Sequence, residues 1–207
     1  MEKGFQTPVK QAEFIIGAAA AKQFPQEPLA EVAFAGRSNV GKSSLMNKLL
    51  NRRKLVRVSG TPGCTREVNF FLINRHWWFV DLPGYGYAKV RRDQYELWNR
   101  TIGDYLSGRP QLRAVLMLID IRRSLLDADL EMIALMESLG IGWVPVVTKA
   151  DKLKSNPRRV ALKKITEKIQ TIERHAICKP IAVSAHSGEG MKVLWNQLLC
   201  ILDPEHV

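Results

Sequence analysis

Nearly continuous apolar runs alternate along the chain with segments in which apolar residues recur every three or four positions. Short runs of this kind are expected of strands that are buried on both faces of a parallel sheet. They cover residues 31–36, 114–120, 143–149 and 179–185. Two further runs, 68–74 and 76–82, flank Asn74-Arg75, a pair that predicts a tight hairpin. The pattern therefore predicts an α/β domain in three layers, with a mixed, mostly parallel six-stranded sheet, one antiparallel edge strand and helices on both faces.

Apolar residues at helical spacing predict the helices that cover this sheet. They occur in residues 42–51, in 126–134 with Asp127 as a candidate N-cap, after Asn156-Pro157, and in 191–201. The Ala-rich residues 10–22 are typical of a further helix, which the prolines of the following FPQEP would end. We therefore expect a single domain over residues 1–207, with an N-terminal helical extension at about residues 8–25.

The composition is that of an ordinary globular protein except for its charge. Of 207 residues, 46% are hydrophobic and 25% are charged, with 31 Lys and Arg against 20 Asp and Glu. A formal charge of +11 indicates a polyanionic partner, either nucleic acid or an anionic membrane. The alternative is a basic surface that is only solvated. We favour nucleic acid, because Lys and Arg neutralise phosphates and release their counterions.

No segment predicts membrane insertion, secretion or a disulfide framework. The chain has no run of 18 or more apolar residues, and MEKGFQTPVKQ at its start lacks the apolar stretch of a signal peptide. The three cysteines, Cys64, Cys178 and Cys200, are scattered, and none belongs to a paired CxxC motif. A reducing, cytoplasmic compartment without membrane attachment fits this pattern best.

GRSNVGKS (36–43) has the spacing of a phosphate-binding loop and lies between a predicted strand and a predicted helix. Successive backbone N–H groups in such a loop, with the helix N-terminus behind them, attract phosphate oxygens. Lys42 would bring a positive charge to the terminal phosphates, and the Ser43 hydroxyl would bind Mg²⁺. A Gly-rich turn without a ligand is the alternative. The predicted phosphate-binding residues here are Gly36, Arg37, Ser38, Asn39, Val40, Gly41, Lys42, Ser43 and Ser44.

DLPG (81–84) follows an apolar strand and complements this loop. Asp81 could reach the same Mg²⁺ through a water molecule, and Gly84 would present its N–H to the γ-phosphate. An Asp at the end of a strand is often only a cap, but its pairing with the loop favours a functional role. We assign Asp81, Leu82, Pro83 and Gly84 to the phosphate-binding set.

TKAD (148–151) follows another buried strand and indicates which base is bound. The Asp151 carboxylate can accept two hydrogen bonds from N1–H and N2–H₂ of guanine, whereas adenine would leave it unpaired. The stem of Lys149 can lie along the base, and Ser184-Ala185 could offer a backbone N–H to guanine O6. ATP is therefore disfavoured. The predicted guanine-binding residues are Thr148, Lys149, Asp151, Val183, Ser184 and Ala185.

GRSNVGKS, PGCTRE, DLPGYGYAK, TKADKL and VSA come in the order of the translation-factor-related class of P-loop GTPases. DLPGYGYAK in particular resembles the EngB family (also called YihA or YsxC) of ribosome-biogenesis GTP-binding proteins, and the resemblance covers roughly residues 8–202. It implies that Ser43 and Thr65 ligate Mg²⁺ and that Gly63 and Thr65, in the first switch, contact the phosphates. Thr148 stands where many related GTPases have Asn, so we expect a weaker tether between base site and phosphate loop.

The same resemblance implies a role in assembly of the large ribosomal subunit, through binding in the GTP-loaded state. Normal cell division and septation would then depend on the protein as a downstream consequence. Two other functions stay open from the residues. One is an RNA-binding scaffold that holds GTP or GDP with little turnover, and the other is a membrane-associated signalling GTPase, which the absence of a lipidation motif disfavours.

Tyr85 follows Gly84 at the position where other GTPases orient the attacking water with Gln. A rigid phenol is a poor analogue of a flexible amide, so we expect slow hydrolysis. Asn39 is the proposed substitute, since an Asn at this position in similar proteins coordinates K⁺, which would offset developing negative charge. The alternative is that Asn39 only tolerates an unusual backbone angle. The predicted catalytic residues are Lys42, Thr65, Gly84 and Asn39.

Basic clusters flank the predicted nucleotide-sensitive loops, which favours salt-sensitive RNA binding that depends on the bound nucleotide. We expect residues 85–89 to form a switch surface for a ribosomal partner, with Gly86 as its hinge. Dispersed surface charge is the alternative. The expected partners are GTP or GDP and the large ribosomal subunit with its rRNA, bound by a monomer. The basic residues are Arg52, Arg53, Lys54, Arg57, Arg66, Lys89, Arg91, Arg92, Arg122, Arg123, Arg158, Arg159, Lys163, Lys164 and Lys168.

Overall fold

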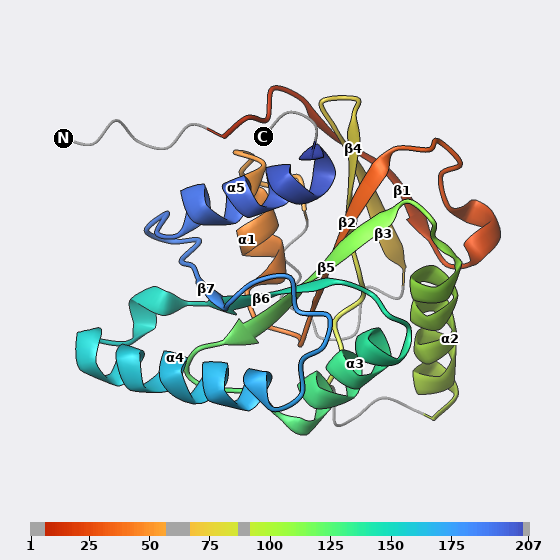
Figure 1. Ribbon diagram of the computed structural model, residues 1–207. Helices are drawn as coiled ribbons and strands as arrows, with labels where there is room; N and C mark the ends of the chain where they lie inside the picture. Colours follow the sequence, from red (N-terminus) through yellow and green to blue (C-terminus); the bar gives the residue numbers. More distant parts are fainter. Residues whose placement is uncertain (1–6, 57–66, 87–91, 205–207) are drawn as a thin grey trace.

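The computed structural model describes residues 7–56, 67–86 and 92–204, with only the backbone for residues 92–99. Within these residues, one mixed sheet of seven strands has the order β1-β3-β4-β2-β5-β6-β7 (Figure 1). The strands are β1 (Ala12–Ala18), β2 (Ala30–Gly36), β3 (Val68–Ile73), β4 (Trp77–Asp81), β5 (Leu112–Asp120), β6 (Trp143–Thr148) and β7 (Ile181–Ala182). The helices are α1 (Lys42–Leu49), α2 (Arg92–Gly108), α3 (Asp127–Ser138), α4 (Ser155–Gln170) and α5 (Met191–Leu202), with short 3₁₀ helices η1 (Ala21–Gln23) and η2 (Ala150–Lys152).

The three-layer α/β arrangement predicted from the sequence is confirmed. Strand β2 pairs in parallel with β4 and β5, and the parallel pairing continues through β6 to β7. Helices α1 and α5 pack on one face of this sheet, and α2, α3 and α4 pack on the other (Figure 1). All six residues of β6 are buried, as are the last seven of β5. Burial on both faces explains why these strands read as continuous apolar runs.

The N-terminal helix predicted over residues 10–22, within an extension at 8–25, is wrong. Residues 12–18 form β1, which pairs antiparallel with β3, and only the 3₁₀ turn η1 follows it. Phe14 packs on Phe71 of β3 with ring centroids 5.5 Å apart. A register shift between Phe14 and Ile16 breaks the alternation of side chains, so the strand pattern is hidden in the sequence. Pairing along β3 outweighs the helix propensity of the alanines.

The structure differs from the sequence prediction in four further elements. Because β1 covers β3, the sheet has seven strands rather than six, and two of its pairings are antiparallel. Helix α2 was not predicted, and β7 is much shorter than the predicted run 179–185. Leu126, rather than Asp127, is the N-cap of α3, and its N–H donates to the Asp129 carboxylate at 3.0 Å.

The predicted hairpin between β3 and β4 is present. Asn74 and Arg75 both have positive φ, 51° and 61°, and the His76 N–H donates to the Ile73 carbonyl at 2.9 Å. Two successive positive φ angles give the turn the twist that an antiparallel pair needs. None of the helices in the described part of the chain is long and apolar enough to span a membrane.

A buried ion pair joins the start of β2 to the segment after α2. The fully buried carboxylate of Glu31 contacts the Arg109 guanidinium and accepts a hydrogen bond from the Tyr105 hydroxyl at 3.0 Å. Arg109 also donates to the Pro25 carbonyl at 2.9 Å, and its guanidinium lies 5.7 Å from the centre of the Phe70 ring. The contacts of this ion pair therefore join β2, β3, α2 and the segment before β2.

Replacing Arg109 by Ala should destabilise the protein strongly. The change leaves the buried Glu31 carboxylate without its cation, a loss of about 3–5 kcal/mol for pairs of this kind. The free energy of unfolding can be measured by urea denaturation. Arg113→Ala is the matched control, because Arg113 is exposed at the same end of the sheet, and it should cost less than about 0.5 kcal/mol. Equal stabilities of the two variants would contradict the role of the pair.

Candidate functional site

The phosphate-binding loop predicted at residues 36–43 connects β2 to α1. Gly36 is the last residue of β2, and Lys42 is the first residue of α1. A Cβ at Gly36 would come within 2.8 Å of Val40 Cγ1 and 3.0 Å of Leu118 Cβ, so no larger residue fits there. Asn39 and Gly41 have φ angles of 63° and 105°, which turn the chain sharply into the helix. The left-handed conformation expected for Asn39 under the backbone alternative is therefore present.

Lys42 and Asp81 meet at the carboxyl edge of the sheet. The register of β2 on β4 sets Phe34 opposite Asp81, so the end of β4 lies beside the loop. The Lys42 ammonium makes an ion pair with the Asp81 carboxylate, and both side chains are largely buried. Ser43 and Ser44 follow in the first turn of α1. One cation, one carboxylate and a neighbouring hydroxyl are thus gathered where the sequence placed phosphate and metal.

Gly84 packs directly against the phosphate-binding loop. A Cβ at this position would meet Ser38 Oγ at 2.9 Å and Ser38 N at 3.4 Å. The Ser38 N–H donates to the Tyr85 carbonyl at 3.1 Å, and the Leu82 N–H donates to the Phe34 carbonyl at 3.1 Å. The residues from Leu82 to Tyr85 therefore continue along the loop, and glycine is required for their close approach.

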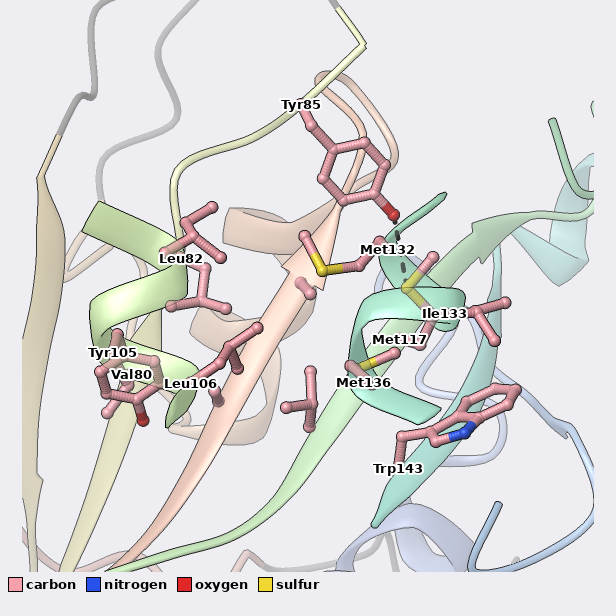
Figure 2. Packing of buried hydrophobic residues seen from close by; sticks show 14 of the residues in the cluster. Val80, Leu82, Tyr85, Tyr105, Leu106, Met117, Met132, Ile133, Met136 and Trp143 are labelled. Atoms are coloured by element: carbon pink, nitrogen blue, oxygen red, sulfur yellow. Dashed lines mark hydrogen bonds between the residues drawn. The ribbon is translucent and has the colours of Figure 1, made fainter. Parts of the chain in front are cut away.

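Tyr85 does not belong to an exposed switch surface, so this part of the expectation for residues 85–89 is wrong. Its ring is buried, and its hydroxyl donates to Asp129 Oδ1 at 3.0 Å and lies 3.3 Å from the Met117 sulfur. Figure 2 shows the ring directed into the core toward Met117 and Met132. The Tyr85 ring gains apolar packing in the core, and its hydroxyl finds a buried acceptor in Asp129, so burial is favoured over exposure to solvent. Gly86 follows with a φ of 82°, and residues 87–91 lie outside the described part of the chain.

Asp129, the acceptor for the Tyr85 hydroxyl, lies in the first turn of α3. Burial raises the pKa of its carboxyl, although the Leu126 N–H, the Tyr85 hydroxyl and the charge of Arg37 act in the opposite direction. Burial also raises the pKa of Tyr85, and the Asp129 charge and hydrogen bond raise it further. The phenol is therefore neutral at ordinary pH and acts as a hydrogen-bond donor. Tyr85 links the end of DLPG to the core by its side chain and to the phosphate-binding loop by its backbone.

The residues predicted to bind guanine surround one cavity. It is lined by Gly41, Ser44, Leu45, Thr148, Lys149, Asp151, Lys152, Val183, Ala185 and His186. Ser184 is buried behind it, and its hydroxyl donates to Asp151 Oδ1 at 2.7 Å. This hydrogen bond lowers the pKa of Asp151, so that its carboxylate is an ionised acceptor at neutral pH. His186 and Lys152, which also line the cavity, were not among the predicted residues, although each directly follows one of them in the sequence.

Thr148 supplies a tether that the sequence did not predict. Its hydroxyl is buried at the end of β6 and lies 2.7 Å from the Val40 carbonyl and 3.2 Å from the Ile119 carbonyl. Since a hydroxyl has one proton, the shorter contact with Val40 is the better hydrogen bond. The base site is therefore joined to the phosphate-binding loop even though an amide is absent at this position.

Asp120, at the end of β5, is a candidate site residue that was not predicted from the sequence. Its buried carboxylate lies 2.9 Å from the Lys149 ammonium and accepts hydrogen bonds from the Arg122 guanidinium at 2.7 and 3.0 Å. Burial alone would raise the pKa of Asp120, but the hydrogen bonds from Arg122 and Lys149 outweigh it and hold the pKa well below its ordinary value. Lys149 also donates to the Asn39 carbonyl at 2.5 Å. The sequence did offer one indication of this role, because Asp120 is a charged residue at the end of an apolar run.

Two predicted site residues, Gly63 and Thr65, lie outside the described residues, as do Arg57, Arg66, Lys89 and Arg91 of the basic clusters. The other residues predicted to bind phosphate and guanine lie together along the carboxyl edge of β2, β4, β6 and β7 (Figure 1). A strand–loop–helix with Lys and Ser, an Asp at the end of the adjacent parallel strand and a carboxylate-bearing base pocket define a P-loop nucleotide-binding protein.

Comparison with known proteins gives the family. Residues 31–149 match a family model described as a 50S ribosome-binding GTPase. The protein named "Probable GTP-binding protein EngB" from Clostridium acetobutylicum is 53% identical over 150 residues, which are 72% of this chain and 75% of that protein. The protein of the same name from Citrifermentans bemidjiense is 43% identical over 95% of this chain and 90% of its own length. This chain therefore belongs to the EngB family of GTP-binding proteins.

Solved structures support the same fold. A crystal structure of a probable GTP-binding protein EngB superimposes with a TM-score of 0.65 and 23% identity, over 85% of this chain and all of that chain. Era in complex with MgGDPNP and nucleotides 1506–1542 of 16S ribosomal RNA gives a TM-score of 0.65 and 23% identity, over 84% of this chain and 57% of that chain. At this identity, the likeness establishes the P-loop GTPase fold alone.

Replacing Asp120 by Asn should weaken binding of GDP and of a GTP analogue by about tenfold, since a hydrogen bond to a charged group contributes about 1.5–3 kcal/mol. The amide is close in size but cannot hold the Lys149 ammonium by charge. Titration with a fluorescent GDP measures the dissociation constant. Asp104→Asn, an exposed change on α2, is the control and should match the unaltered protein. Unchanged affinity in the Asp120 variant would contradict the positioning role of Asp120.

Proposed function

We propose that this protein is a nucleotide-controlled assembly factor for the large ribosomal subunit that binds GTP and hydrolyses it slowly. The observation that carries the proposal is the single edge on which the Lys42–Asp81 pair, the loop 36–43 and the Asp151 pocket lie together. The matching family model, whose description is a 50S ribosome-binding GTPase, supplies the ribosomal part. Its place of action is the cytoplasm, its partner is the subunit and its rRNA, and it acts as a monomer.

The phosphates would lie over the loop from Gly36 to Ser44, whose backbone N–H groups and helix N-terminus favour negative charge. Lys42 would exchange its contact with Asp81 for the terminal phosphates, and the Gly84 N–H would face the γ-phosphate. In the first switch, Gly63 and Thr65 would complete the phosphate contacts. A residue larger than glycine would not fit at position 84, because its Cβ would meet Ser38.

The oxygen groups at the edge fit Mg²⁺. This ion prefers few protein ligands and keeps waters and phosphate oxygens. The Ser43 hydroxyl and that of Thr65 would hold it directly, and Asp81 would hold it through a water. When bound, Mg²⁺ would neutralise charge on the β- and γ-phosphates. Guanine would be read by Asp151, oriented by Ser184, with Lys149 along the base, Thr148 tethering the site to Val40, and Val183 and Ala185 closing the pocket.

Slow hydrolysis is supported by the direction of the Tyr85 side chain. The residue after Gly84 is committed to a buried hydrogen bond with Asp129, so it offers no group to orient a water. Asn39, in the catalytic set with Lys42, Thr65 and Gly84, would take part of that task by coordinating K⁺, which would offset charge near the bridging oxygens. The same observation favours a second candidate function, a nucleotide-stabilised RNA-binding scaffold with little turnover. Division and septation would depend on either function indirectly, through ribosome supply.

The assembly function predicts nucleotide-dependent association with the large subunit. When the protein is sedimented with isolated large subunits, we expect more of it in the subunit fraction with a non-hydrolysable GTP analogue than with GDP, because the switches reorder when the γ-phosphate is lost. Single-turnover hydrolysis with and without subunits separates the two candidates: stimulation supports the assembly GTPase, and unstimulated, near-zero turnover supports the scaffold. Equal association with both nucleotides would overturn nucleotide control.

The K⁺ role of Asn39 predicts that GTP turnover is faster in KCl than in NaCl, by roughly an order of magnitude. Asn39→Gly separates the two interpretations of this residue, because glycine accepts the φ of 63° without strain but offers no amide oxygen. That variant should lose the difference between the salts while still binding GDP. Asn51→Gly is the control, since Asn51 also has a positive φ, of 50°, outside the loop. A salt difference that survives in Asn39→Gly would refute coordination by this side chain.

A further inference from the structure

A basic groove lies beside the nucleotide site, between the segment joining β5 to α3 and the first half of α4. Arg122 and Arg123 line it from one side, and Arg159 and Lys164 line it from the other. Among the described residues that line it, none is acidic. The side chain of Val160, which also lines the groove, is 50% exposed, so the groove combines apolar surface with a ring of cations.

Three of these four cations have no carboxylate partner in the part of the chain that the structure describes. Arg123, Arg159 and Lys164 are exposed, and none forms a side-chain ion pair within residues 7–56, 67–86 and 92–204. Arg158, next to Arg159 on α4, differs, because its guanidinium is held by Glu189 at 2.5 and 2.9 Å. The groove is therefore lined by three unpaired cations, whereas the neighbouring paired Arg158 does not line it. A chain with a formal charge of +11 has repulsion to relieve, and an anionic partner would relieve it here.

The basic residues near the start of α4 are also unfavourably placed with respect to the helix dipole. The positive end of a helix favours acidic residues in its first turn, but α4 has none there, and its N-cap residue, Lys154, makes no side-chain capping bond. Arg158 and Arg159 follow within the first five residues of the helix. Cations at this end of a helix are unfavourable, because they face the positive end of its dipole. A local conflict of this kind in an otherwise consistent fold points to a function that compensates it.

We propose that this groove binds the phosphate backbone of RNA, an inference that rests on the proposed ribosomal function and gives its contact surface. Cations from two segments on either side of a concave surface match a strand of phosphates, whereas the basic residues that bind a bilayer lie along the polar face of one amphipathic helix. The apolar floor at Val160 can pack against sugar or base. Arg122 connects the groove to the nucleotide site, because the same guanidinium holds Asp120, which holds Lys149.

The test compares two triple variants of the full chain that remove the same charge. One carries Arg123→Ala, Arg159→Ala and Lys164→Ala. The control carries Arg113→Ala, Lys179→Ala and Lys192→Ala, three exposed cations that do not line the groove. Binding to deproteinised large-subunit rRNA is measured by filter retention across a series of KCl concentrations. GDP affinity and thermal midpoint are measured for both.

The groove variant should bind the RNA about tenfold more weakly, and its log–log salt slope should be smaller by about two. The control variant should keep nearly the full affinity and a steeper slope than the groove variant. GDP affinity should be unchanged, and the thermal midpoint of the groove variant should be equal or slightly higher, because one cation, Arg159, has left the N-terminal part of α4. Retained affinity and slope in the groove variant would overturn the proposal. So would equal losses in the two variants, which would show a diffuse charge effect.

Two further outcomes separate this inference from the proposed function. If the groove variant still sediments with large subunits as the unaltered protein does, the groove is refuted and the ribosomal function stands. If the unaltered protein binds the RNA through the groove but never associates with subunits, the groove stands and the ribosomal function fails. Binding to vesicles of phosphatidylglycerol and phosphatidylethanolamine in equal parts tests the alternative partner, an anionic membrane. Groove-dependent binding to them in preference to RNA would overturn the proposal.

Discussion

The parallel pairing of β2 with β4 on one side and β5 on the other decides where the candidate phosphate-binding groups lie. The register sets Phe34 opposite Asp81 and Gly36 opposite Leu118, so the three strands end together. These strands are buried on both faces, and a slip of one residue would turn each side chain to the wrong layer. The loop after β2, the carboxylate that ends β4 and the carboxylate that ends β5 are therefore held at one edge by packing on both faces of the sheet, rather than by their own interactions.

At that edge, each buried charge has a partner from another segment. Lys42 on α1 contacts Asp81 at the end of β4, and Lys149 contacts Asp120 at the end of β5. An unpaired charge in such a place would cost several kcal/mol, and each pair avoids that cost at a position that the packing of the sheet has already fixed. The same groups are those that phosphate, metal and base would contact, because a site that holds charged ligands needs charged side chains that are ordered beforehand. Stability and binding use the same ion pairs here.

The motifs predicted most of the residues that the structure brings together at the candidate site, because each carries its chemistry in a short stretch of sequence. GRSNVGKS, DLPG and TKAD needed only a strand before them to be placed, and the apolar runs supplied those strands. What failed depended on contacts between distant segments. The Ala-rich residues near the N-terminus form β1 only because β3 is available for pairing, and Asp120 joins the candidate site through its contact with Lys149, which follows another strand. Neither partnership is visible in a local pattern.

Tyr85 shows how one position can serve the structure at the expense of the chemistry expected there. Its carbonyl accepts from Ser38 in the phosphate-binding loop, and its hydroxyl donates to Asp129 on α3. Withdrawing the ring from the core would expose apolar surface at a cost of about 2 kcal/mol and leave the Asp129 carboxyl short of a donor. Any rearrangement of the DLPG segment must therefore either meet that cost or begin beyond Tyr85. Gly84 is fixed beside the loop in consequence, and the side chain after it cannot also orient a water. The proposed catalytic help would then come from the loop itself, where Asn39 lies, or from a partner.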